Sequence, residues 1–383
     1  MTNTHKDALF VLVKSLSKSE KRQFKLYVGR LGVNTDAKFL ALFNLLDKIK
    51  HYDEKIILES GIVKKAQLSN LKAHLYKQIL VSLRLNPVNQ NIRVQIREQL
   101  DFATILYQKG LYKQSLKILD KVKTTAIENE EKNIAYEIVE LEKIIETQFI
   151  TRSIPDRANE LALQAKELSG HNVMTSKLSN LSLQLYGMML KVGYVRSDED
   201  YQKVKTYFND HLPLYNIEDL GFREKLWLYK AYLWYSFLTQ DFLSCYKYAS
   251  KWVDLFYEHK DMIYLNPVFF LKGNHYLLES LFYVQYSSQF KEVLERLENT
   301  IKDKNFPDND NINSLVFMYI NANKLNLYFL EGTFEKGLYL VKIIEYGINK
   351  HRDRIDIHHV MVLYYKIACL YFGIGDNKTC IQY

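Results

Sequence analysis

Side chains that could do acid–base or metal chemistry are few and poorly spaced in this sequence. His358 and His359 are adjacent, so on a helix they would point about 100° apart and could not chelate one ion together. His351 and Asp353 belong to a charged run, HRDRIDIHH, where a loop and the start of a helix are expected. The sequence contains no P-loop, GxGxxG, GxSxG or HExxH motif. We therefore expect no enzyme activity, no catalytic residue, no metal site and no cofactor.

The three cysteines have a structural explanation. Cys245, Cys369 and Cys380 form no CxxC pair and cannot build a disulfide framework, which is typical of a reducing compartment. Cys245 and Cys380 each follow a tight turn by five residues, where Ser115 and Gly337 stand after other turns. We predict that this is a small-residue position at which the two helices of a hairpin approach each other, and that cysteine serves there as a small hydrophobe.

The sequence contains neither a signal peptide nor a membrane span that we can identify. The apolar stretch from Ala8 to Val13 is too short for the core of a secretory signal. There is also no run of 18 apolar residues. We expect a cytoplasmic protein with no membrane partner.

The composition favours an all-α fold. The 383 residues include only 14 Gly and 5 Pro, against roughly 27 and 19 at average usage. So few turn residues indicate long helices joined by short loops. The 29 Tyr and 20 Phe would then fill the seams between helices.

The charge is concentrated at the N-terminal end. Residues 1–93 contain 17 Lys plus Arg and 7 Asp plus Glu, whereas the whole chain has a net charge of only +8. The segment around Asn86, Pro87 and Asn89 is the clearest linker in the first half. We therefore predict a basic helical domain at 1–90 and a second domain at 91–383.

The basic domain supports an alternative hypothesis about function. Ser17 and Glu20 have the spacing of a capping box, which would start a helix with several cations on its outer side. A phosphate-facing patch of this kind would make the protein a nucleic-acid-binding regulator whose second domain senses a partner. Its candidate phosphate contacts are Lys18, Lys21, Arg22, Lys25 and Lys72.

Beyond residue 93 the sequence repeats. Apolar helices are interrupted by tight turns, predicted at Gly110, Gln240, Ser288, Gly332 and Gly375. The last three intervals are 48, 44 and 43 residues, and the first, of 130, is close to three such periods. Further breaks are expected near 153–156 and 193–200. This periodicity predicts about seven helical hairpins with a period of about 44 residues, stacked as a right-handed superhelical α-solenoid.

A family resemblance lies in these turns. The segments YQKGLYKQSLKIL, LTQDFLSCYKYASKW and LEGTFEKGLYLVKIIEYG resemble the turn region of tetratricopeptide repeats (TPRs), in which a glycine precedes an aromatic and then a small residue. The resemblance covers about residues 93–383. The period is longer than the 34 residues of that family, and the proline that ends its unit is absent, so the units are TPR-like. No family is identified for the N-terminal domain.

The resemblance implies a binding surface. The first helices of TPR-like hairpins line the concave face, and their exposed positions recur at helical spacing before each turn. Such a surface suits a peptide with hydrophobic anchors; in the alternative interpretation, the same rings pack together as core. Counting back from the predicted turns places these residues on the concave groove: Trp227, Lys230, Trp234, Phe237, His275, Phe282, Tyr319, Asn326 and Phe329.

The function predicted from these observations is that of a non-enzymatic scaffold that binds a protein or peptide partner. Trp234 occupies the place of the first asparagine with which some TPR proteins hold a peptide carboxylate, so recognition of a C-terminal carboxylate is not expected. The last unit stops at Tyr383 without a polar terminal helix. Because solenoids normally end in a polar cap, we expect the chain to be truncated at its C-terminus or to dock there.

Overall fold

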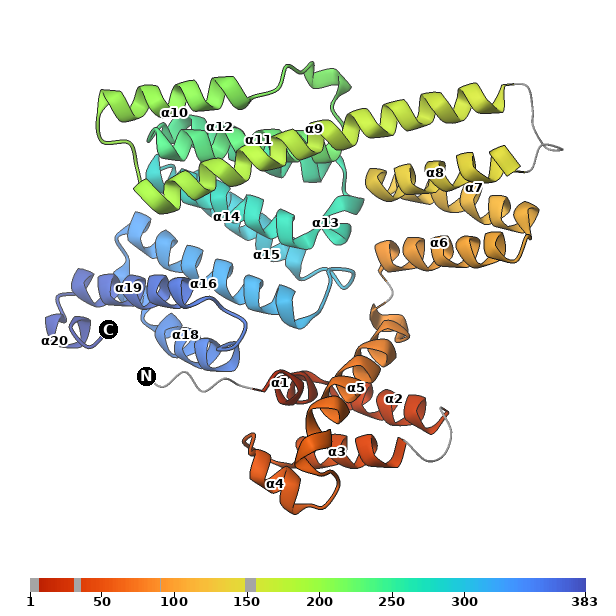
Figure 1. Ribbon diagram of the computed structural model, residues 1–383. Coiled ribbons are helices and arrows are strands. Elements are labelled where there is room, and N and C mark those ends of the chain that lie inside the picture. The colour runs from red at the N-terminus through yellow and green to blue at the C-terminus, as the bar shows by residue number, and fades with distance from the viewer. Residues whose placement is uncertain (1–6, 31–35, 90, 149–155) are drawn as a thin grey trace. The chain divides into compact units, whose positions relative to one another are not determined.

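The computed structural model describes residues 7–30, 36–89, 91–148 and 156–383. Throughout these ranges the regular structure is helical and there is no strand (Figure 1). The prediction of an all-α protein is confirmed. The chain divides into two compact units, Met1–Asp101 and Phe102–Tyr383. The division lies within a helix, eleven residues beyond residue 90, the predicted end of the first domain.

The first unit is a small helical domain. Its second helix begins with the predicted capping box, in which the Ser17 side chain accepts from the backbone N–H of Glu20 and the Glu20 carboxylate accepts from that of Ser17. Phe24, Phe39 and Phe43 are fully buried among aliphatic side chains from the other helices. The helices are α1 (Ala8–Ser15), α2 (Lys18–Gly29), α3 (Asp36–Lys48), α4 (Glu54–Glu59), α5 (Lys65–Arg84), the 3-10 turn Pro87–Asn89 and the start of α6 (Ile92–Gln108).

The second unit is a succession of longer helices. Polar side chains cap many of them; Asp241, Asn309 and Asp356 each accept from a backbone N–H in the first turn of the helix that follows. The helices are α7 (Tyr112–Glu128), α8 (Lys132–Gln148), α9 (Arg157–Val192), α10 (Asp198–His211), α11 (Phe222–Leu238), α12 (Phe242–Glu258), α13 (Asp261–Leu265), α14 (Pro267–Tyr283), α15 (Ser287–Ile301), α16 (Asp310–Glu331), α17 (Phe334–Gly337), α18 (Tyr339–Lys350), α19 (Ile357–Gly373) and α20 (Asn377–Cys380).

Helices of the second unit pack mainly on their neighbours in sequence (Figure 1). Helix α11 packs on α9 and α12, α14 packs on α12, α15 and α16, and α16 packs on α14, α15, α18 and α19. The first helix of one pair therefore contacts its own partner and the next pair. This arrangement of neighbouring helical pairs is compatible with a helical repeat fold.

Four of the five predicted turns are confirmed. Gly110, Gln240, Gly332 and Gly375 have positive φ angles of 58° to 81°, in the left-handed region that ends a helix. The turn predicted at Ser288 is wrong, because the residue with positive φ is Gln285 (58°) and Ser288 lies in the first turn of α15. Gln240 is followed two residues later by an aromatic, Phe242, whereas Gln285 is followed by Ser287. Alignment on the next aromatic, Phe290, therefore placed this turn three residues late.

The region between the first and second predicted turns is built differently from the rest. Of its expected breaks, residues 153–155 lie outside the described residues, and the break near 193 is confirmed by Gly193, whose φ is 78°. Between them, α9 runs for 36 residues without interruption. It packs on α8, α10 and α11. One long helix thus serves two successive hairpins.

The small-residue positions after the turns are confirmed at three places. Ser115 and Cys245 are fully buried, and the Ser115 hydroxyl donates to the carbonyl of Ala103 at 2.8 Å. A Cβ added to Gly337 would lie 2.8 Å from a methyl of Leu370. Two helices therefore approach too closely there for a large side chain.

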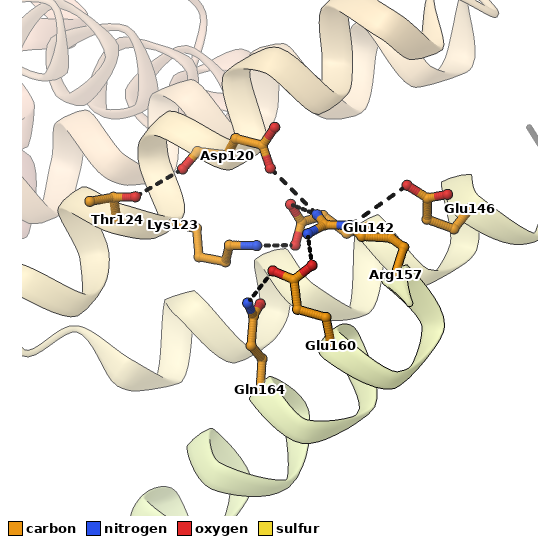
Figure 2. A network of polar contacts seen from close by, with 8 residues as sticks. All are labelled: Asp120, Lys123, Thr124, Glu142, Glu146, Arg157, Glu160 and Gln164. Carbon is orange, nitrogen blue, oxygen red and sulfur yellow. Dashed lines mark hydrogen bonds and ion pairs between the residues drawn. The ribbon is translucent and has the colours of Figure 1, made fainter. Parts of the chain in front are cut away.

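A buried cluster of charges joins α7, α8 and α9 (Figure 2). The Glu142 carboxylate is fully buried and accepts from the Lys123 ammonium at 2.6 Å and from the Arg157 guanidinium at 3.3 Å. The Arg157 side chain also contacts other carboxylates, at 2.9 to 3.8 Å. We call this set the Glu142 cluster; its members are Asp120, Lys123, Glu142, Glu146, Arg157 and Glu160.

The Glu142 cluster is electrostatically compensated. Burial raises the pKa of Glu142 above its ordinary value, although the hydrogen bond from Lys123 and the charge of Arg157 act against the shift. Each cation of the cluster has at least one carboxylate within 4 Å. The cluster therefore links three helices and leaves neither of its cations unpaired.

Candidate functional site

Two adjoining hollows, of about 450 and 670 Å³, lie in the second unit. They share eight lining residues, among them Tyr186, Trp234 and Tyr319, so they form one continuous groove. Five helices contribute to it: α9, α11, α14, α16 and α19. We call this the groove, and its main lining residues are Leu183, Tyr186, Leu190, Lys230, Trp234, Phe237, Lys272, His275, Tyr276, Glu279, Met318, Tyr319, Asn326, Asp356, His359 and Lys366.

The structure brings six of the nine residues predicted for the concave groove into this lining. They are Lys230, Trp234, Phe237, His275, Tyr319 and Asn326. The other three are not among the described lining residues. Trp227 packs edge-on against Phe269, with ring centroids 5.4 Å apart, and Phe329 packs against Phe334 at 6.1 Å. The ring of Phe282 lies 5.8 Å from the ammonium of Lys366.

Sequence reasoning missed residues on two helices because two turns were misplaced or not used. Once the turn after α14 is set at Gln285, the same helical spacing selects Lys272 and Glu279, which both line the groove. The turn at Gly193 selects Leu183 and Leu190 on α9 in the same way. Placing these two turns correctly therefore adds four lining residues, although the same spacing also selects Trp227 and Phe329, which do not line the groove.

The aromatic residues of the groove form a packed floor. Trp234 and Tyr319 are only 8% and 3% exposed. The Trp234 ring contacts those of Tyr186 and Tyr276 at 4.8 and 5.4 Å, and the rings of Tyr319 and His275 are stacked at 4.5 Å. The ring faces are thus largely occupied by each other, as the alternative interpretation of the aromatic stripe expected. The most exposed apolar side chains are instead aliphatic, Leu183 (66%) and Leu190 (68%), followed by the ring of Tyr186 (37%).

A chain of hydrogen bonds crosses the α14, α16 and α19 side of the groove. The Lys366 ammonium donates to the Asn326 amide oxygen at 2.6 Å, and the Asn326 amide nitrogen donates to the Asn323 amide oxygen at 3.5 Å. The Asn323 amide nitrogen lies 3.2 Å from Nδ1 of His275. An amide nitrogen can only donate, so Nδ1 accepts and the His275 proton is on Nε2, 3.9 Å from the Glu279 carboxylate.

This polar chain fixes the protonation of its members. Burial, together with the positive charges of Lys366 and its neighbours, lowers the pKa of His275 to about 3, so the ring is neutral near pH 7. Burial also raises the pKa of Glu279, and the charge of Lys366 opposes that shift. Lys366 has a lowered pKa for the same reason, burial. His275 therefore contributes no positive charge to the groove near pH 7.

Two further lysines of the groove differ from Lys366 in having no polar partner among the described residues. Burial and the charge of Lys272 lower the pKa of Lys230 to about 8, and burial lowers the pKa of Lys272. The Lys230 ammonium lies 4.5 Å from the centre of the Trp227 ring. Throughout the described ranges, neither lysine has a carboxylate within 4 Å. Both line the smaller hollow.

The candidate phosphate contacts of the first unit are divided between paired and exposed residues. Lys72 forms an ion pair with Asp7 and a hydrogen bond with the Tyr52 hydroxyl, and Lys21 lies 2.7 Å from the Asp47 carboxylate. Exposed residues make up the remainder: Lys18, Arg22 and Lys25. Two of the five cations are thus engaged by carboxylates of the protein itself, and phosphate binding stays a prediction.

The histidines first considered for metal chemistry, His351, His358 and His359, belong to no cluster of potential metal ligands in the described ranges. No group of three potential metal ligands is found there. His351 stacks on Phe317, with ring centroids 5.4 Å apart. Its neighbours in sequence, His358 and His359, have rings 5.8 Å apart and inclined by 79°.

Comparisons with known proteins supply no relative. No family model matches the sequence, and neither the curated proteins nor the solved structures gave a match. None of the described helices is both long and apolar enough to cross a membrane. The likeness to tetratricopeptide repeats therefore rests on the turn residues and on the pairing of neighbouring helices alone.

Proposed function

We propose that this chain is a non-enzymatic scaffold that binds a protein or peptide segment in the groove. In this proposal the helical pairs of the second unit stack as a right-handed TPR-like solenoid, and the groove lies on its concave face. The observation that carries the proposal is that the first helices of successive pairs, α11, α14, α16 and α19, together with α9, all contribute to one hollow surface. A ligand bound along its whole length would contact these five helices at once.

The size of the groove suits an extended segment. Neighbouring helices lie about 8–10 Å apart, so a surface crossing five helices is on the order of 30 Å long. An extended chain advances about 3.3 Å per residue, which corresponds to about nine residues. The exposed leucines Leu183 and Leu190 offer apolar contacts at one side, and hydrogen-bonding groups lie opposite on α14, α16 and α19.

Selection from a random 12-residue peptide library tests this function. We expect the full chain to enrich a peptide family, and the Leu183→Asp/Leu190→Asp variant to bind its members at least about tenfold more weakly. Leu243→Asp is the matched control, because Leu243 is equally exposed (62%) but lies on the second helix of its pair, α12. Enrichment of no peptide, or equal loss in the control variant, would overturn the proposal.

A further inference from the structure

The smaller hollow of the groove is rich in hydrogen-bond donors that have no acceptor. Lys230 and Lys272 both line it and lack a carboxylate partner in the described part of the chain. Ser182 and Trp234 also line it, but the Ser182 hydroxyl and the Trp234 indole nitrogen are themselves buried from solvent, without a hydrogen-bond partner among the described residues. The two lysines are therefore the accessible unpaired donors of this hollow of about 450 Å³.

The acidic and basic groups near these donors are already engaged. Asp356 lines the same hollow, but its carboxylate accepts from the backbone N–H of His358 and caps α19. Arg354 is paired with Asp310, at 2.5 Å. Glu279 lines the larger hollow only. No carboxylate of the described residues therefore neutralises the two lysines.

Such an arrangement is unfavourable unless something else supplies the acceptors. Two like charges that are half-buried side by side disfavour each other, and an unpaired buried donor loses its hydrogen bond to water. Elsewhere in the same unit, buried cations are held by carboxylates, as in the Glu142 cluster. A ligand with a carboxylate would give Lys230 and Lys272 the kind of partner that Glu142 gives to Lys123 and Arg157.

We propose that the partner segment bound in the groove is acidic, with an aspartate or glutamate side chain seated between Lys230 and Lys272 and aliphatic residues against Leu183 and Leu190. This inference rests on the proposed function, because it names the chemistry of the segment that the groove binds. The carboxylate oxygens accept from both ammonium groups, and charge-assisted hydrogen bonds of this kind are about twice as strong as neutral ones.

Single-stranded nucleic acid is the other polyanion that a basic groove with aromatic residues could bind. Its recognition depends on bases stacked on accessible ring faces. Here Trp234 and Tyr319 are 8% and 3% exposed, and their faces are covered by other rings of the groove. Tyr186 is the exposed ring of this lining, at 37%, and it packs against Trp234. One such ring offers no series of stacking platforms, and the most exposed apolar side chains are those of Leu183 and Leu190, which suit a peptide.

The experiment uses the same random 12-residue library, with every peptide amidated at its C-terminus so that the only carboxylates are those of side chains. The full chain is compared with Lys230→Gln/Lys272→Gln. The matched control is Lys291→Gln/Lys342→Gln, which removes two exposed lysines from the second helices α15 and α18. A 30-residue oligothymidine is measured in parallel at the same salt concentration.

The outcomes separate this inference from the proposed function. We expect acidic residues to be enriched by the full chain and by the control variant, and acidic peptides to bind Lys230→Gln/Lys272→Gln at least about tenfold more weakly. If peptides are enriched without acidic residues, or if the groove variant keeps the acidic preference, the acidic segment is overturned and the peptide-binding function stands. If no peptide is enriched, or if only oligothymidine binds and depends on Lys230 and Lys272, both proposals are overturned.

Discussion

The Glu142 cluster and the groove both place lysine side chains away from water, with opposite results for the pairing of their charges. Lys123 lies 2.6 Å from the Glu142 carboxylate, and Arg157 completes the compensation. Lys230 and Lys272 have no carboxylate within 4 Å in the described ranges, and burial lowers the pKa of both. The charge of Lys123 is thus compensated within the fold. The charges of Lys230 and Lys272 are not, and they lower the stability of the folded protein.

The largest effect is expected when the compensated cluster loses its central carboxylate. Glu142→Ala leaves Lys123 and Arg157 buried beside a cavity, and we expect the free energy of unfolding to fall by about 3–5 kcal/mol. Urea denaturation measures it. Glu199→Ala is the control, because its ion pair with Lys203 lies on an exposed helix surface, where such pairs contribute little to stability. If both variants lost the same free energy of unfolding, the buried carboxylate would be no more important to stability than the exposed one.

The opposite sign is expected in the groove. A lysine whose pKa is lowered to about 8 in the folded protein is charged at pH 7 in both states, but its charge is disfavoured in the folded one. We therefore expect Lys230→Met to raise the free energy of unfolding at pH 7 by on the order of 2 kcal/mol, allowing for the partial exposure of the side chain.

This gain should depend on pH. Between about pH 8 and 10.5, the folded wild-type protein loses the Lys230 proton before the unfolded chain does, so the wild type becomes more stable and the difference narrows. Urea denaturation of both proteins at pH 7 and pH 9.5 measures this. A variant that is less stable than the wild type at pH 7 would show that Lys230 has a structural role like that of Lys123.

A smaller effect is expected when the central ion pair is replaced as a whole. In Lys123→Met/Glu142→Leu, both buried charges leave together, and Arg157 keeps its contacts with Asp120, Glu146 and Glu160. We expect the free energy of unfolding to change by less than about 1 kcal/mol, because removing both partners of a buried pair leaves no orphan charge. A loss as large as that of Glu142→Ala would mean that the pair specifies the packing of α7, α8 and α9.

The smallest effect is the response of the groove to a simple anion. Sulfate that binds weakly between Lys230 and Lys272 would raise the melting temperature of the wild type by about 2 °C at 100 mM, relative to chloride at equal ionic strength. Lys230→Gln/Lys272→Gln should lack this difference, whereas Lys291→Gln/Lys342→Gln should keep it. A sulfate effect of the same size in all three proteins would remove the evidence for an anion site.

Local patterns in the sequence predicted much of the helical framework. The capping box at Ser17 and Glu20, the left-handed turns at Gly110 and Gly332, and the small residue at Cys245 each depend on neighbours within a few positions. These features are therefore readable from residue types and spacing. The period of the repeat also followed from them, and it led to six residues of the groove.

The tertiary structure decided what depends on distant residues. The turn at Gln285 lacks the aromatic residue that follows the turns at Gly110, Gln240 and Gly332 by two positions, and its misplacement by three residues hid Lys272 and Glu279. The compensation of Lys123 comes from another helix, and so does the ring packing that covers Trp234. Burial and charge pairing are set by contacts between segments far apart in the chain. The sequence therefore shows where the lysines are, but only the packing of the helices decides that Lys123 has a carboxylate partner and that Lys230 and Lys272 have none in the described ranges.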